Sequence, residues 1–225
     1  MSVYALADLH GCFNLFQKVK TFLNPKDIVY VLGDCGDRGP NSWKTIKAVY
    51  KDPQFIYLKG NHEDMLVQAM KNARNADNPF GGLEYKLLRI NGGKNTFKDW
   101  LKEDNKYKWT TNLSKLPVFT TYTNKNNIRI LLNHSGSDEF SSEEEMIWDR
   151  SHFENWFSKN YDLIVHGHTP SILLHEDLNQ DIKTFKPGAY WYCDNHKIDL
   201  DCGSAWSGIT VLFNLDTFEE HIFQI

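Results

Sequence analysis

The 225-residue chain carries 25 lysine and arginine residues against 29 aspartate and glutamate residues, a formal net charge of -4 at pH 7. This balance excludes a general electrostatic affinity for nucleic acid or for an anionic membrane surface, so we expect neither as a partner. With 41% hydrophobic residues and no apolar run near the length of about 20 residues that spans a membrane, the composition is that of one globular domain over residues 1–225.

The amino-terminal residues and the cysteines indicate a cellular compartment. The chain opens without the charged and apolar regions of a secretory signal, and its four cysteines form no CxxC pair. Reduced thiols fit this pattern. We therefore expect a cytoplasmic location.

Strand-like and helix-like segments alternate over the first quarter of the chain. The segments are strand-like at 2–8, 27–34 and 54–61 and helix-like at 13–23 and 42–51. This alternation predicts βαβ units and a partly parallel sheet. Ligands of such sheets gather where the carboxyl ends of the strands meet the following loops.

The remaining chain divides into a helical part and a strand-rich part. Helical spacing and glycine breaks predict a helical insertion over about residues 63–116. Short strands are expected after Pro117, at 118–123, 128–134, 161–168, 190–195, 197–203, 208–215 and 218–225. These seven segments predict a second, mixed or largely antiparallel sheet that faces the first. The expected fold class is therefore α/β, with two facing sheets flanked by helices.

Acidic and imidazole side chains follow several of the predicted strands. The clusters consist of Asp8 and His10, then Asp34, Asp37 and Arg38, then Asn61 and His62, then His134, and finally His166 and His168. Because strand ends converge at one rim of a sheet, we expect these clusters to meet although they are far apart in sequence. The gathering of such groups predicts a metal site.

The types of these side chains indicate which ions would bind. Asp8 and His10 lie two residues apart on one side of an extended chain, so both can reach one cation. A carboxylate has lone pairs enough to bridge two cations, and Asp34 is our candidate for the bridge. A ligand set of imidazole, carboxylate and amide without thiolate favours Mn or Fe, and it also suits Zn, Ni or Co.

Five blocks in order, DLHG, GDCGDRG, GNHED, NHSG and HGHT, resemble the signature of the calcineurin-like metallophosphoesterases. They are most similar to the bacterial and phage branch of the Ser/Thr phosphoprotein phosphatases, the lambda-phosphatase-like branch. The segment DLDCGSAWSGIT resembles the closing strand of the family, and NGGKNT resembles a motif in its helical region. The resemblance implies a metallophosphoesterase fold with four αββα layers and two divalent metal ions.

The resemblance also assigns roles to individual residues. It implies that six residues hold the two ions, with Asp8, His10 and Asp34 on one ion and Asp34, Asn61, His134 and His168 on the other. His62 would be the general acid at the leaving group, and Asp37 would orient its ring. Arg38 would bind the substrate phosphate, with help from Asn61 and from Arg150 in the block IWDRS.

Two of these positions have alternatives. Arg150 can instead form a solvated ion pair with Asp149 or with one of the glutamates at 143–145. His166 is expected at the strand end or as a donor to a ligand, because the family ligand is the histidine that follows the glycine.

The expected activity is hydrolysis of a phosphomonoester by a hydroxide that two metal ions hold between them. The phosphatase resemblance makes a phosphorylated protein or peptide the expected partner, with phosphoserine or phosphothreonine as the substrate group. One alternative is symmetrical hydrolysis of dinucleoside tetraphosphates, because those hydrolases carry the same five blocks. Another is a catalytically silent metal-binding scaffold. The oligomeric state is left open.

Overall fold

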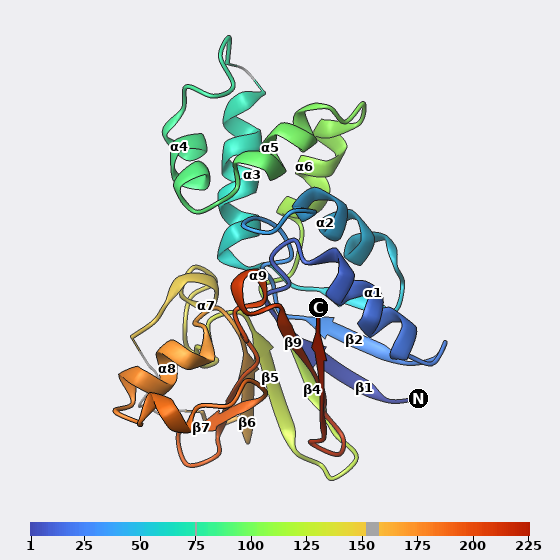
Figure 1. The fold of residues 1–225 in the computed structure, drawn as a ribbon, viewed down its shortest axis with the longest axis vertical. Helices are drawn as coiled ribbons and strands as arrows, with labels where there is room; N and C mark the ends of the chain where they lie inside the picture. Colours follow the sequence, from blue (N-terminus) through green and yellow to red (C-terminus); the bar gives the residue numbers. More distant parts are fainter. Residues whose placement is uncertain (75, 152–157) are drawn as a thin grey trace.

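The computed structural model describes residues 1–74, 76–151 and 158–225. Its strands form two sheets of five strands each (Figure 1). The first sheet has the order β10-β9-β1-β2-β3, and its strands are β1 (Val3–Leu6), β2 (Ile28–Val31), β3 (Phe55–Tyr57), β9 (Ile209–Asn214) and β10 (Glu220–Gln224). Strands β1, β2 and β3 are parallel, so the predicted parallel part of the sheet is confirmed.

The last two strands correct the sequence analysis, which placed them in the second sheet. Strand β9 pairs antiparallel with β1, and β10 pairs antiparallel with β9. The burial of the two strands explains this order. Five consecutive residues of β9, at 210–214, are buried, as a central strand requires, whereas every second residue of β10 is exposed, as at a sheet edge.

The second sheet is mixed, as predicted. It has the order β4-β5-β6-β8-β7, and its strands are β4 (Phe119–Thr123), β5 (Arg129–Asn133), β6 (Leu163–His166), β7 (Tyr190–Tyr192) and β8 (Lys197–Asp199). The central strands β5, β6 and β8 are parallel, and the outer strands β4 and β7 are antiparallel to their neighbours. Parallel central strands place the ends of β5 and β6 at one edge.

An apolar core joins the two sheets. Ala5 of β1 and Phe213 of β9 come from the first sheet, and Leu132, Val165 and Ile198 come from the second; all five side chains are inaccessible to solvent. Consecutive residues of these strands are buried, which accounts for their runs of apolar residues without alternation. The predicted arrangement of two facing sheets flanked by helices is confirmed.

The helices cover the outer faces and one end of the sheets (Figure 1). They are α1 (Phe13–Phe22), α2 (Ser42–Lys51), α3 (Asn61–Ala73), α4 (Leu83–Ile90), α5 (Lys94–Leu101), α6 (Lys106–Ser114), α7 (Glu145–Trp148), α8 (Ser171–Asp177) and α9 (Ser204–Ser207). Helices α3 to α6 stand together above the sheets in this view, while α7 and α8 lie beside the second sheet. Within the described ranges, no helix is both long and apolar enough to cross a bilayer.

Candidate metal centre

The loops after β1, β2, β5 and β6 and the start of α3 bring the predicted ligands together. The ligand atoms form two groups. His10, Asp34 and His62 make the first, and Asp34, His134 and His168 make the second; within each group the atoms lie within 4.8 Å of one another. All five residues are buried. Asp34 belongs to both groups, so its position suits a carboxylate shared between two cations.

The second group directs acceptor atoms from several residues toward one point. The carbonyl of Leu32 lies 2.6 Å from His134 Nδ1, and the carbonyl of Trp148 lies 3.3 Å from His168 Nε2. A carbonyl only accepts, so these ring nitrogens donate, and the lone pairs are on His134 Nε2 and His168 Nδ1. These two atoms lie 3.1 Å apart, and Asp34 Oδ2 lies 3.4 Å from His134 Nε2. Such a convergence of acceptors fits a cation.

The electrostatics of His168 support the neutral form that a metal ligand requires. Burial, together with the nearby His134, lowers the pKa of His168 to about 2. The Asn61 side-chain oxygen lies 3.0 Å from His134 Nε2 and 3.1 Å from His168 Nδ1, so the amide completes this group. Neutral imidazoles, an amide oxygen and a carboxylate are suitable ligands for a divalent transition metal.

Asp8 offers an oxygen that has no hydrogen-bond partner. Its Oδ2 accepts from the backbone N–H of His168 at 3.0 Å, whereas its Oδ1 is buried and unpartnered among the described residues. That Oδ1 lies 3.7 Å from His10 Nε2, and His10 Nε2 lies 3.7 Å from Asp34 Oδ2. Burying a carboxylate oxygen without a partner costs free energy of folding, and a cation bound at this position would offset that cost.

We expect divalent metal to stabilise the fold measurably. Adding Mn²⁺ at about 100 times its dissociation constant to protein stripped with a chelator should contribute about 2.7 kcal/mol. For a chain of this size, that corresponds to a rise in melting temperature of roughly 5 to 10 °C, measured by calorimetry. Asp34→Asn should lose most of the rise. A wild-type melting temperature unchanged by Mn, Fe, Zn, Ni or Co would contradict the site.

The backbone at the site is strained. Six of its residues other than glycine have a positive φ: Asp8 (53°), His10 (40°), Asp34 (54°), Asp37 (64°), Arg38 (62°) and His168 (74°). A left-handed conformation costs such a residue about 1 kcal/mol or more, so it persists only where the surroundings hold it. Strain concentrated in the loops that carry the ligands is typical of a functional site, and the sequence analysis did not predict it.

His62 and Asp37 form a hydrogen-bonded pair next to the ligands. His62 Nδ1 lies 2.7 Å from Asp37 Oδ2, and Thr96 donates its hydroxyl to Asp37 Oδ1 at 2.6 Å. His62 Nε2 lies 3.9 Å from Asp34 Oδ2. The ring therefore has one nitrogen on the carboxylate of Asp37 and the other beside the ligand group.

The two predicted phosphate-binding arginines lie at different parts of the cluster. Arg38 Nη1 donates to His10 Nε2 at 2.6 Å, and Arg38 Nη2 donates to His62 Nε2 at 3.0 Å. Arg150 donates to the hydroxyl of Thr169 at 2.7 Å and to the backbone oxygen of His168 at 3.1 Å. Arg38 is therefore next to the first ligand group and Arg150 next to the second.

His166 lies apart from the ligand atoms. Among the described residues it belongs to neither ligand group, and its ring nitrogens lie 2.7 Å from Tyr192 Oη and 2.9 Å from the backbone oxygen of Gly167. Its place at the end of β6 matches the expectation for the histidine that precedes the glycine.

Glu63 organises the site, and the sequence analysis missed it. Its buried carboxylate accepts from the backbone N–H groups of Asp34, Cys35 and Gly60 and from the hydroxyl of Tyr57, at 2.6 to 3.0 Å. These bonds tie the loop after β2 to the start of α3. A signal was available, because a glutamate at the third position of a helix often accepts from the residue before the helix.

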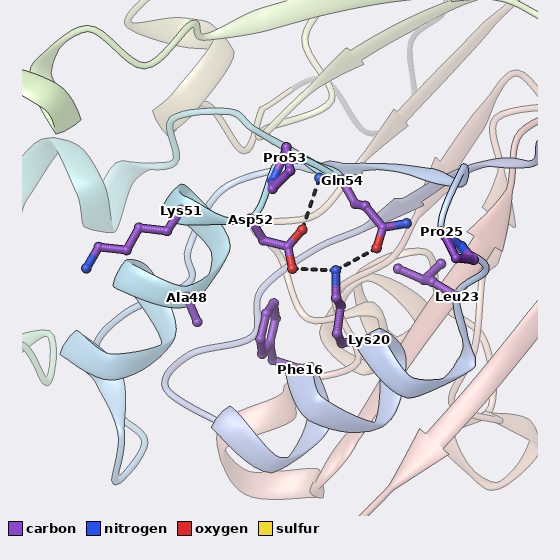
Figure 2. Close-up of a pocket in the computed structure, with 9 residues that line it drawn as sticks. All are labelled: Phe16, Lys20, Leu23, Pro25, Ala48, Lys51, Asp52, Pro53 and Gln54. Atoms are coloured by element: carbon purple, nitrogen blue, oxygen red, sulfur yellow. Dashed lines mark hydrogen bonds and ion pairs between the residues drawn. The ribbon is translucent and has the colours of Figure 1, made fainter.

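A large hollow lies elsewhere on the surface, at the opposite ends of the strands. It has a volume of about 710 Å³ and is lined in part by residues that precede β2 and β3, such as Pro25 and Gln54 (Figure 2). Lys20 bonds both Asp52 and Gln54 there. The buried ligand cluster, and not this hollow, carries the candidate chemistry.

The two-sheet fold and a buried cluster of imidazoles and carboxylates at the strand ends define a metallophosphoesterase, a class of phosphoester hydrolases. The chain belongs to this class by sequence as well. Residues 1–201 match the family model of the calcineurin-like phosphoesterases, so the chain belongs to that family.

Curated relatives of this chain are named symmetrical bis(5'-nucleosyl)-tetraphosphatases. One from Wigglesworthia glossinidia brevipalpis is 37% identical over 67 residues, which are 28% of this chain and 25% of the relative. The match thus spans only about a quarter of that protein. One from Pseudomonas putida strain GB-1 is 23% identical over 283 aligned residues, covering 98% of this chain and 92% of the relative.

Solved structures share the fold at low sequence identity. A putative diadenosine tetraphosphatase has a TM-score of 0.62 at 14% identity and covers 99% of this chain and 92% of its own. A protein serine/threonine phosphatase from Saccharomyces cerevisiae has a TM-score of 0.61 at 13% identity, with coverage of 100% and 80%. Two structures named for different substrates match almost equally, so the fold does not select the substrate.

Proposed function

We propose that this chain is a metal-dependent phosphomonoester hydrolase that removes phosphate from phosphoserine or phosphothreonine in proteins and peptides. The observation that carries the proposal is the His62–Asp37 pair: Asp37 bonds Nδ1 of the ring, and the other ring nitrogen, Nε2, lies 3.9 Å from Asp34 Oδ2. A serine or threonine alkoxide is a poor leaving group that needs a proton as it departs. A buried acid beside the ligand cluster meets that need.

Two divalent ions, Mn²⁺ in our proposal, would be held by the six predicted ligands. When bound, such ions supply an activated water and neutralise charge on the phosphoryl oxygens. Hydrogen bonds to the backbone orient the imidazole ligands. For example, His10 Nδ1 donates to the carbonyl of Gly36 at 2.9 Å, which leaves the lone pair on Nε2. Burial lowers the pKa of His10 to about 3, which keeps it neutral as a ligand.

His62 would act as the general acid. Burial disfavours a charged ring, but the negative charges of Asp34 and Asp37 outweigh it and raise the pKa of His62 above its usual value. In the charged form, Nδ1–H donates to Asp37, and Nε2–H is available to the leaving oxygen once Arg38 donates to the substrate phosphate instead of to Nε2. After that proton is transferred, the neutral ring keeps its bond to Asp37.

Arg38 and Arg150 would bind the phosphoryl group from two sides of the cluster. A guanidinium presents planar donors that match two phosphate oxygens at once. Both arginines already donate to site residues, Arg38 to His10 and His62 and Arg150 to the loop after β6. The amide of Asn61 would assist them. Substrate phosphate would give these donors stronger, charged acceptors.

A second candidate is symmetrical hydrolysis of dinucleoside tetraphosphates. It is favoured by the curated relatives, which carry that name. The leaving group would then be a nucleoside diphosphate, which departs with less need of a proton than an alkoxide.

The NGGKNT segment supports the first candidate, the lambda-phosphatase-like branch. In this segment the backbone oxygen of Gly92 accepts from the N–H of Arg38, and the Thr96 hydroxyl donates to Asp37.

A substrate panel separates these two candidates. Protein loaded with Mn²⁺ should release phosphate from a phosphoserine peptide and from 4-nitrophenyl phosphate, with turnover within the range of about 1 to 1000 per second common to enzymes. Diadenosine tetraphosphate should be cleaved with at least about tenfold lower kcat/KM, a difference of roughly 1.4 kcal/mol. Faster production of ADP than of phosphate would favour the second candidate instead.

A further inference from the structure

The NGGKNT segment touches the turn that carries the candidate acid-orienting and phosphate-binding residues. The backbone oxygen of Gly92 accepts from the backbone N–H of Arg38 at 3.2 Å. The hydroxyl of Thr96, in the first turn of α5, donates to Asp37 Oδ1 at 2.6 Å. Thr96 is inaccessible to solvent. The helical part of the chain therefore holds this turn by two hydrogen bonds.

The two glycines of the segment permit this close approach. Gly92 has a φ of +94°, and a Cβ there would lie 2.9 Å from Arg38 Cγ. A Cβ at Gly93 would lie 2.9 Å from Asp37 Oδ1. Side chains at these positions would push the start of α5 away from Asp37 and Arg38, and so would separate Thr96 from Asp37.

The carboxylate of Asp37 is fixed at both of its oxygens. Oδ1 accepts from Thr96, and Oδ2 is bonded to Nδ1 of His62 at 2.7 Å. With a single partner, the carboxylate could rotate about its Cβ–Cγ bond, and the His62 ring could turn with it. The second bond removes that freedom and sets the direction in which His62 Nε2 points.

We propose that Thr96 is a positioning residue: it holds Asp37 so that His62 keeps the orientation in which its Nε2 faces the leaving group. This inference rests on the proposed function, in which His62 is the general acid. The helical region thus contributes to catalysis through one hydroxyl that touches neither the substrate nor a metal ligand. Partners of this kind typically change activity about 10- to 100-fold when they are lost.

Thr96→Val tests the proposal, because valine keeps the shape of threonine and removes the hydroxyl. We expect kcat on a phosphoserine peptide to fall about 10- to 100-fold with KM within about twofold. On 4-nitrophenyl phosphate, whose leaving group needs no proton, the fall should stay below about threefold. Thr96→Ser, which retains the hydroxyl, should recover activity on the peptide to within about threefold of wild type.

A matched control is Thr110→Val in α6, since the Thr110 hydroxyl donates to the backbone oxygen of Lys106, one turn back in its own helix. It should leave both activities unchanged. Full peptide turnover in Thr96→Val would overturn the proposal. Equal losses on both substrates in Thr96→Val and Thr96→Ser would also overturn it, because they indicate a general packing defect.

A second readout does not depend on hydrolysis. The proton on His62 Nδ1, assigned by its loss in His62→Asn, should give a downfield proton NMR signal because it is bonded to a carboxylate. In Thr96→Val this signal should move upfield or broaden, and in Thr96→Ser it should stay. If the wild-type protein hydrolyses neither phosphopeptide nor aryl phosphate, the proposed function fails, while an unchanged signal in Thr96→Val separately overturns the positioning role.

Discussion

Asp34→Asn is expected to lower turnover on every phosphoester substrate by about a thousandfold, because several kcal/mol of charge stabilisation would be lost and each 1.4 kcal/mol or so is a factor of ten. Among the described residues, Asp34 alone belongs to both ligand groups. Burial opposes its charge, but His134 and His62 hold the pKa of Asp34 well below its usual range, so it is an anion. Asparagine has one acceptor oxygen and no charge, and it cannot replace a shared carboxylate.

Measuring bound metal and secondary structure shows whether Asp34→Asn loses activity through loss of a metal ligand or through unfolding. Elemental analysis of purified Asp34→Asn should show less bound metal than the wild-type protein, while circular dichroism stays native. Asp27→Asn is a suitable control, since Asp27 is also buried but bonds to Ser2 and Asn24 at the other end of β2. That variant should keep its metal and turnover. An Asp34→Asn protein with undiminished metal and activity would refute the shared-ligand role.

The gathering of the ligands could be predicted from the sequence because each one follows a strand. Asp8 follows β1, Asp34 follows β2, His134 follows β5 and His168 follows β6, and parallel strands end at the same edge. The motifs mark those strand ends, and the geometry of a parallel sheet brings the ends together at one edge.

It was harder to predict to which of the two sheets each strand belongs. Whether β9 lies beside β1 or in the second sheet depends on which free edge it meets, and local alternation does not encode that.

The supporting contacts could not be predicted in the same way. Thr96 lies 59 residues from Asp37 in sequence, in a helix whose apolar spacing gives no sign of that hydroxyl bond. Asp8 and His10, which have positive φ angles, donate their backbone N–H groups to the loop after β2, at Gly33 and Asp34. Helix α8 was also missed, although Pro170 directly before it is a usual sign of a helix start. The Thr96 bond and the positive φ angles depend on tertiary contacts, which periodicity and motif spacing do not report.

His62→Asn is expected to reduce turnover on a phosphoserine peptide by about 100- to 10,000-fold, the contribution that a general acid usually makes. Asparagine can keep a hydrogen bond to Asp37, but it has no proton to transfer at neutral pH. The loss on 4-nitrophenyl phosphate should be much smaller, because nitrophenolate departs without protonation. Steady-state kinetics on the two substrates, with His221→Asn at a site remote from the ligand cluster as a control, measure this difference.

Metal analysis of the same variant decides between two roles for His62, whose ring nitrogen is part of the first ligand group by distance. If His62 is the acid, His62→Asn should retain its metal and lose only the turnover that needs a proton. If it is a ligand, metal and both activities should fall together. The geometry favours the acid, because the bond from Nδ1 to Asp37 holds the ring as such a donor requires. A His62→Asn protein that turns over the phosphopeptide at the wild-type rate would rule out both roles.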